Sequence, residues 1–177
     1  MNKKIKVMLV EDHPEYRDVI DLALKDEPDI ELISQVGSSE RALQILQNRL
    51  DDMVPDVILL DLNLPGKSGL ESLHSLRSSC PGTRIIVLTQ SDSESDVLRA
   101  VQSGASGYLL KSSTVSQIGE AIRTVADGGA MLGSGVAKYI LNTLQTRLTS
   151  VEIQSALSQR ELEILTLLGE GQLKKEI

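Results

Sequence analysis

Aromatic residues and cysteine are scarce in this chain of 177 residues. It has no tryptophan and no phenylalanine, three tyrosines, one cysteine and two histidines. Without aromatic side chains on which bases can stack, it lacks the surface that single-strand nucleic-acid binding proteins use. The single Cys80 excludes an intrachain disulfide and a cysteine-rich zinc site. The two histidines, His13 and His74, are far apart and form no recognised zinc motif.

Long apolar runs are also missing. The run near the N-terminus, residues 7–10, ends at Glu11 and Asp12, which is too short for a signal peptide. No segment approaches the roughly 20 apolar residues that a membrane-spanning helix needs. We therefore expect a cytoplasmic protein that does not enter a membrane.

Basic residues are outnumbered by acidic ones. Lysine and arginine number 18 and aspartate and glutamate 25, which gives a formal net charge of −7. An acidic surface opposes binding to nucleic-acid phosphates, so stand-alone DNA binding is not expected. Hydrophobic residues make up 41% of the chain, which is ordinary globular composition. The length suits one domain with an appendage.

Short aliphatic segments alternate with amphipathic ones along the first two thirds of the chain. Nearly continuous apolar segments are typical of parallel strands that are buried on both faces. Five strand–helix repeats predict a doubly wound α/β fold, with helices on both faces of the sheet. We expect strands at 5–10, 30–36, 57–60, 84–88 and 107–110, and helices at 14–25, 39–50, 70–78, 93–103 and 114–126.

The pattern changes after residue 126. Residues 127–135 contain four glycines, and a sixth helix is expected at 136–148. That helix either packs on its own domain or serves as a linker or dimerisation helix. A further helix is expected at 158–168, with Ser158 as its N-cap and Glu161 at the reciprocal capping-box position. The sequence thus divides into a domain at 1–126, a glycine-rich loop and linker helix at 127–150, and a C-terminal fragment at 151–177.

Chemically active side chains follow four of the expected strands. Glu11 and Asp12 follow the first strand, Asp61 the third, Thr89 the fourth and Lys111 the fifth. Ligands of open α/β sheets bind at the carboxyl ends of the strands, so these side chains are expected to converge. Clustered carboxylates repel one another unless a cation neutralises them, and oxygen ligands suit Mg²⁺. The amine and hydroxyl can hold phosphoryl oxygens while Asp61 acts as a nucleophile.

The same residues lie in motifs that resemble those of bacterial two-component response regulators of the NarL/FixJ type. The resemblance covers about residues 4–126 as a receiver domain, and a further segment resembles the opening of a LuxR-type helix-turn-helix. The receiver motifs are VEDHP (10–14), LDLNLPGKSG (60–69), VLT (87–89) and GASGYLLK (104–111); the helix-turn-helix motifs are LSQRE (157–161), EG (170–171) and KEI (175–177).

The resemblance implies a fold and a metal site. The fold is a flavodoxin-like, five-stranded parallel sheet with strand order 2-1-3-4-5, followed by a helical linker and a helix-turn-helix fragment. Asp61 is then the phosphoacceptor and also a ligand of Mg²⁺. Asp12 ligates the ion directly, Glu11 acts on it mostly through water, and Asn63 offers its backbone carbonyl.

Roles for the remaining motif residues also follow from the resemblance. Thr89 and Lys111 bind the phosphoryl oxygens, and Tyr108 is the switch aromatic whose rotamer follows Thr89. A half-buried strand residue without a switching role is the plainer interpretation of Tyr108. Pro65 and Gly66 shape the loop after the phosphoacceptor. His13 is interpreted as a residue at the entry of a helix rather than as a metal ligand.

The function implied is that of a regulator rather than an enzyme, apart from Mg²⁺-dependent self-phosphorylation and dephosphorylation. The expected phosphodonor is a sensor histidine kinase or a phosphotransfer protein, and the expected output is control of transcription by a phosphorylation-dependent homodimer. Specific DNA binding is expected only of a longer chain, because the recognition helix of a complete helix-turn-helix would follow residues 174–177.

Two other classes of function fit the sequence less well. A phosphatase of the haloacid-dehalogenase kind also uses a nucleophilic aspartate after a strand, but it needs an acid two residues later, where this chain has Asn63. A pseudo-receiver scaffold or other flavodoxin-like binder would not need the intact acidic set.

The sequence departs from the usual receiver pattern at two positions. Ser112 follows Lys111 where many receivers have proline, so the geometry of this loop is left open. Gln90 follows Thr89 where small residues are usual. Its side chain either narrows the space above Asp61 or points away from it.

Overall fold

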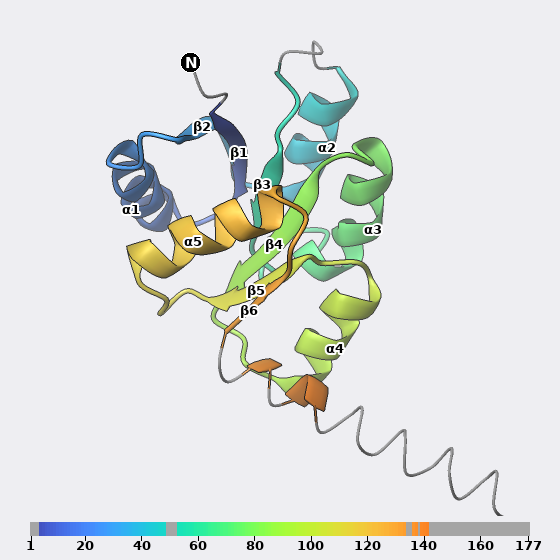
Figure 1. Ribbon diagram of the computed structural model, residues 1–177. Coiled ribbons are helices and arrows are strands. Elements are labelled where there is room, and N and C mark those ends of the chain that lie inside the picture. Colours follow the sequence, from blue (N-terminus) through green and yellow to red (C-terminus); the bar gives the residue numbers. More distant parts are fainter. Residues whose placement is uncertain (1–3, 49–52, 134–135, 138, 142–177) are drawn as a thin grey trace, which may run out of the picture. The chain divides into compact units, whose positions relative to one another are not determined.

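A parallel sheet with strand order β2-β1-β3-β4-β5-β6 forms the centre of the structure (Figure 1), a computed structural model. The expected order of the first five strands is confirmed. A sixth strand of two residues adds to the β5 edge, within the segment expected to be a glycine-rich loop. The strands are β1 (Ile5–Val10), β2 (Ile30–Val36), β3 (Val57–Leu60), β4 (Arg84–Thr89), β5 (Gly107–Leu110) and β6 (Met131–Leu132).

The structure describes residues 4–48, 53–133, 136–137 and 139–141. By its internal contacts the chain divides into two units, 1–137 and 138–177. Residues 136–137 and 139–141 are helical, in agreement with the start of the helix expected at 136–148. The rest of that helix and the fragment at 151–177 lie outside the described residues. None of the helices in the described part of the chain is long and apolar enough to cross a membrane.

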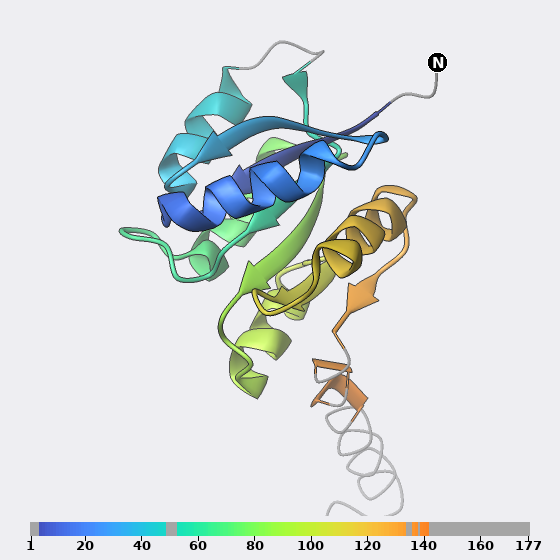
Figure 2. The same cartoon turned by 90° about the vertical axis from the view of Figure 1, so that its left-hand side faces the viewer.

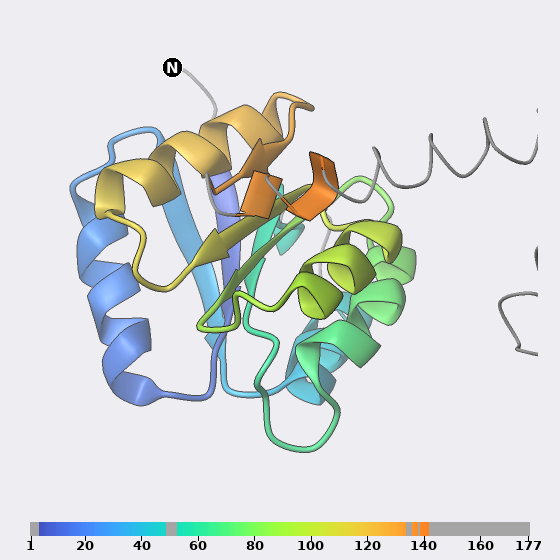
Figure 3. The ribbon, with the colours of Figure 1, turned by 90° about the horizontal axis from the view of Figure 1, so that it is seen from below.

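Five helices cover the two faces of the sheet. Figure 3 shows α1 and α5 on one face and α2, α3 and α4 on the other. Their observed ends lie within one residue of the expected ones, apart from α2. The helix expected at 39–50 ends three residues early, at Gln47, because Asn48 leaves the helical conformation as its C-cap. The helices are α1 (Pro14–Lys25), α2 (Ser39–Gln47), α3 (Gly69–Ser79), α4 (Glu94–Gln102) and α5 (Val115–Ala126).

Side-chain caps fix where four of these helices begin. The hydroxyl oxygens of Ser38, Ser68, Ser93 and Thr114 each accept a hydrogen bond from a backbone N–H in the first turn of the following helix. Such caps satisfy donors that the helix itself leaves unpaired. Helix α1 has no side-chain cap and starts with Pro14, whose missing N–H costs nothing at that position. The caps keep the loops at the carboxyl edge of the sheet well defined.

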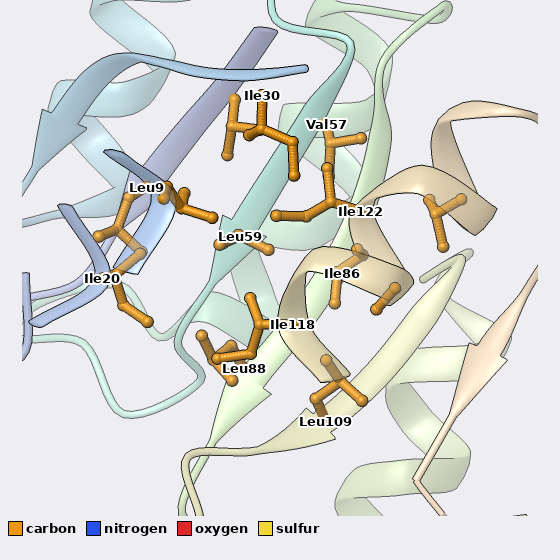
Figure 4. Close-up of a cluster of buried hydrophobic side chains, with 14 residues drawn as sticks. Leu9, Ile20, Ile30, Val57, Leu59, Ile86, Leu88, Leu109, Ile118 and Ile122 are labelled. Carbon is orange, nitrogen blue, oxygen red and sulfur yellow. The ribbon is translucent and has the colours of Figure 1, made fainter. Parts of the chain in front are cut away.

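The main apolar core lies between the sheet and the α1–α5 layer (Figure 4). Figure 2 shows these two helices together on this face. Because successive strand residues point to opposite faces, Val7 and Leu9 enter this core, while Met8 and Val10 are buried beneath the other layer. Burial on both faces explains why β1, β3, β4 and β5 are nearly continuous apolar runs, whereas the edge strand β2 carries the exposed Glu31 and Gln35. The polar residues that form the site lie at the ends of the buried strands.

Gly69 allows the start of α3 to lie against the backbone of Asp61. Its N–H donates a hydrogen bond to the Leu62 carbonyl, with an N–O distance of 3.0 Å. A Cβ atom added at this position would lie 1.9 Å from the carbonyl oxygen of Asp61. No side chain fits there unless the backbone moves. The sequence motif contains this glycine, but its spacing does not reveal the contact.

We expect Gly69→Ala to destabilise the fold by about 1–3 kcal/mol, because overpacking forces the backbone to shift. Gly82→Ala is the matched control, since nothing lies within 4 Å of its added Cβ. It should change the free energy of unfolding by less than about 1 kcal/mol. Urea unfolding of the two variants measures this difference. Equal stability of the two would show that the Asp61 loop moves aside at little cost.

Candidate functional site

The backbone hydrogen bonds between neighbouring strands continue past the strand ends and position the functional side chains. Glu11 and Asp61 directly follow β1 and β3, Thr89 ends β4, and Lys111 directly follows β5. The backbone N–H of Asp61 still donates to the Val10 carbonyl at 3.0 Å, and that of Lys111 donates to the Thr89 carbonyl at 2.8 Å. Because these bonds extend the sheet, the side chains emerge from a rigid edge rather than from a free loop.

The Lys111 ammonium joins two buried carboxylates. Its Nζ lies 2.7 Å from Asp61 Oδ2 and 2.5 Å from Glu11 Oε2. The three side chains are only 8%, 2% and 1% exposed, in the order Lys111, Asp61 and Glu11. Burial by itself lowers the pKa of Lys111, but the hydrogen bonds to Asp61 and Glu11 outweigh it, so the net shift is upward. The lysine is therefore fully charged at neutral pH and acts as the counter-ion of this pair.

Asp12 and His13 complete the acidic edge. The imidazole Nδ1 of His13 lies 2.9 Å from Asp12 Oδ1 and 3.0 Å from Glu11 Oε1. The hydrogen bond to Glu11, together with the charge of Asp12, raises the pKa of His13 above its ordinary value. Asp12 Oδ1 is buried yet accepts no well-formed hydrogen bond. One ligand atom from each of Glu11, Asp12, His13 and Asp61 lies within 4.8 Å of the others, so the cluster could hold a metal ion.

Two charged side chains support the loops of the site through backbone atoms. Arg17 Nη1 donates to the carbonyl oxygens of Glu11 and Asp12, at 2.7 and 3.2 Å. Glu40 Oε1 accepts from the backbone N–H of Lys67, at 3.1 Å, in the loop between β3 and α3. Neither residue is among the site residues predicted from the sequence. No spacing rule identifies a side chain that binds a distant backbone, so only the structure reveals them.

Asp61 has a second hydrogen-bond partner besides the lysine. The backbone N–H of Asn63 donates to Asp61 Oδ1 at 3.2 Å. The Asn63 side chain is exposed, so its contribution to the site comes from the backbone. Both carboxylate oxygens of Asp61 are thus oriented, one by Asn63 and the other by Lys111.

Ser91 links Thr89 to Tyr108. The backbone N–H of Ser91 lies 3.4 Å from Thr89 Oγ1, and its carbonyl accepts a hydrogen bond of 2.8 Å from the Tyr108 hydroxyl. Tyr108 is 0% exposed, so it is more deeply buried than the plain strand interpretation assumed. Burial and the nearby Asp96 carboxylate raise its pKa to about 12. Thr89 and Tyr108 are predicted together from the family resemblance, whereas Ser91 is not among the predicted residues.

A cavity of about 300 Å³ opens beside the lysine, lined by His13, Glu15, Tyr16, Val19, Gln90 and Lys111. The Tyr16 ring lies over the Lys111 ammonium, 4.8 Å from ring centroid to Nζ, and burial raises the pKa of Tyr16 to about 12. Gln90 is exposed on the wall of this cavity. Ser112 is the second position at which the sequence departs from the usual receiver pattern. The Lys111–Ser112 peptide bond is trans, as are all peptide bonds in the described part of the chain.

The receiver domain family of response regulators matches residues 7–123. The nitrate/nitrite response regulator protein NarP of Escherichia coli is 40% identical over 172 residues, which are 97% of this chain and 78% of that protein. A LuxR-family response regulator from Aurantimonas is similar in structure, with a TM-score of 0.72 and 26% identity over 80% of this chain and 98% of that chain. An RcsB dimer solved on DNA shares the fold, with a TM-score of 0.69 and 20% identity over 97% of this chain and 79% of that chain.

The fold and the acidic edge thus define a receiver, and this chain belongs to the response regulator receiver domain family. Within it, the chain is a two-component response regulator of the NarL/LuxR type, a class that controls transcription. Its relatives are regulators rather than enzymes in the usual sense. The family resemblance drawn from the motifs is confirmed.

We expect Lys111→Met to lower the stability of the metal-free protein by about 3–5 kcal/mol, because it leaves Glu11 and Asp61 buried without their counter-ion. Methionine retains most of the apolar stem. Lys67→Met is the matched control, since Lys67 is exposed and should change stability by less than about 0.5 kcal/mol. The free energy of unfolding in urea, measured in a chelator, gives both values. Similar values would mean that the carboxylates do not need the ammonium.

Proposed function

We propose that this protein accepts a phosphoryl group on Asp61 with the help of Mg²⁺, and that phosphorylation changes its conformation to control transcription. The arrangement of Asp61 supports the proposal. It is a buried carboxylate at the carboxyl end of β3, 2.7 Å from a lysine ammonium and inside a cluster that could hold a cation. We assign residues 1–126 as the receiver, 127–150 as the linker and 151–177 as the start of a helix-turn-helix.

Oxygen atoms suited to Mg²⁺ surround Asp61. Asp12 and Asp61 would ligate the ion through carboxylates, Asn63 through its backbone carbonyl, and Glu11 mostly through water. The buried Asp12 Oδ1 without a well-formed hydrogen bond fits such a role, because a cation would satisfy it. When bound, Mg²⁺ neutralises the carboxylates and the charge on the transferring phosphoryl oxygens.

In the proposed transfer, an Asp61 carboxylate oxygen attacks the phosphorus of the donor. The new bond is an acyl phosphate O–P bond, and the bond from phosphorus to the donor's nitrogen or oxygen breaks, with that electron pair leaving on the donor. The Lys111 ammonium then shifts its contact to a phosphoryl oxygen, and the Thr89 hydroxyl donates to another. Both groups are preorganised by the sheet, which suits a reaction that depends on positioning and charge.

The conformational signal would pass from Thr89 to Tyr108. When Thr89 Oγ1 turns to a phosphoryl oxygen, its contact with the Ser91 N–H changes, and Ser91 also accepts the Tyr108 hydroxyl. A two-state equilibrium of the loop between β4 and α4 then responds to the phosphoryl group. Roles for Thr89 and Tyr108 as switch residues are part of this proposal.

The proposed partners are a sensor histidine kinase or phosphotransfer protein and a second copy of this chain. DNA is proposed as a partner only for a chain with a complete helix-turn-helix. Because dimeric readers of paired half-sites need two subunits, phosphorylation should favour self-association. A phosphatase of the haloacid-dehalogenase kind is disfavoured because Asn63 offers no acid at the required position.

Asp61→Asn should abolish labelling by a small acyl phosphate in the presence of Mg²⁺, because the amide keeps the shape but not the nucleophile. Intact-protein mass analysis should show one added phosphoryl group on the wild type and none on the variant. Asp127→Asn, which removes an exposed carboxylate after α5, should be labelled like the wild type. Labelling of Asp61→Asn at the wild-type level would overturn the assignment.

Beryllium fluoride, a mimic of the phosphoryl group, should raise the dimer fraction in sedimentation velocity at micromolar concentrations. The reason is that the mimic shifts the conformational equilibrium toward the state proposed to associate. The mass of Asp61→Asn from sedimentation velocity should be the same with and without beryllium fluoride. An unchanged mass of the wild type with and without the mimic would contradict phosphorylation-dependent association.

A further inference from the structure

The His13 imidazole lies at the cation cluster instead of capping its helix. His13 is the N-cap residue of α1, yet its side chain makes no capping hydrogen bond. Its Nδ1 instead lies between the Glu11 and Asp12 carboxylates, at 3.0 and 2.9 Å. The backbone supports this placement, because the His13 N–H donates to Glu11 Oε1 at 3.0 Å. The residue at the helix entry therefore also contributes a nitrogen atom to the acidic edge.

The position of this nitrogen is compatible with ligation. Ligand atoms of His13, Glu11, Asp12 and Asp61 lie within 4.8 Å of one another, so small side-chain movements bring all four around one ion. The His13 side chain is 60% exposed and has room to make such a movement. The Glu11 and Asp61 carboxylates, by contrast, are held by Lys111. The rigid oxygens and the adjustable imidazole thus form a mixed oxygen and nitrogen donor set.

We propose that His13 is a nitrogen ligand of the cation site and makes the site favour Mn²⁺ and Co²⁺ over Mg²⁺. The proposal rests on the proposed metal site and adds its selectivity. Mg²⁺ takes oxygen ligands almost entirely and keeps several waters, so an imidazole contributes little to its binding. Imidazole suits later divalent ions better, and their affinities for nitrogen-containing sites rise along the first-row series. With His13 as a ligand, the affinities for these ions therefore differ more than they would with three carboxylates alone.

Pulsed electron paramagnetic resonance of bound Mn²⁺ tests the ligand directly. The wild-type protein should show ¹⁴N modulation from a coordinated imidazole, and His13→Ala should lose it. His74→Ala is the matched control, because His74 is the other histidine of the chain and is exposed on α3. It should keep the wild-type signal. Asp12→Asn should weaken the binding of both Mn²⁺ and Mg²⁺, which places the ion at the acidic edge.

Calorimetric titration gives the selectivity. Removal of one nitrogen ligand should lower the affinity for Co²⁺ by about tenfold or more and the affinity for Mn²⁺ by less, with little change for Mg²⁺. A wild-type protein that binds both ions without nitrogen modulation, and with a Mn²⁺/Mg²⁺ affinity ratio that His13→Ala leaves unchanged, would overturn this inference alone. His13 would then only neutralise the carboxylates. Failure of the wild type to bind any of these cations at the acidic edge would instead overturn the proposed function.

Discussion

The ion triad of Lys111 with the buried carboxylates of Glu11 and Asp61 is the constraint on which the other parts of the site depend. It joins the ends of β5, β1 and β3 across one edge of the sheet. Two carboxylates that are almost fully buried repel each other, and one ammonium cannot neutralise them together with Asp12. The site therefore keeps an excess of negative charge, which favours the binding of a cation. The buried negative charge that prepares the site for phosphoryl transfer thus also opposes the stability of the folded state.

The sheet and the convergence of its strand-end residues followed from the sequence. Strands β1, β2, β3 and β5 have the expected bounds. In β1, β3 and β5, burial on both faces imposes nearly continuous apolar runs. Asp61 and Lys111 are 50 residues apart and still meet, since parallel strands deliver their carboxyl ends to one edge. The strand order came from the family resemblance rather than from periodicity. Strand β6, with two residues, is too short to give a pattern.

Residues that act through backbone atoms were not predictable. Arg17 and Glu40 bind backbone carbonyl or N–H groups of the loops, and Ser91 contacts the Thr89 and Tyr108 hydroxyls through its own backbone N–H and carbonyl. Every residue type carries these backbone groups. Their partners are therefore invisible in a sequence. The side chain of His13 was equally hard to predict. The predicted position of the residue at a helix entry is confirmed, but its imidazole faces the Glu11 and Asp12 carboxylates. Backbone position follows from local sequence, but the direction of a polar side chain depends on distant charges.

The edges of the sheet restrict how two copies of this receiver can join. Strand β6 covers β5 with only two residues, so the outer edge there offers little backbone for another strand. At the other edge, β2 carries the exposed Glu31 and Gln35, and its register with β1 is broken between Val7 and Met8. Charged side chains and bulges at edges discourage pairing between sheets. Extension of the sheet from one subunit into the next is thus disfavoured, which leaves the helical surfaces for contacts between subunits.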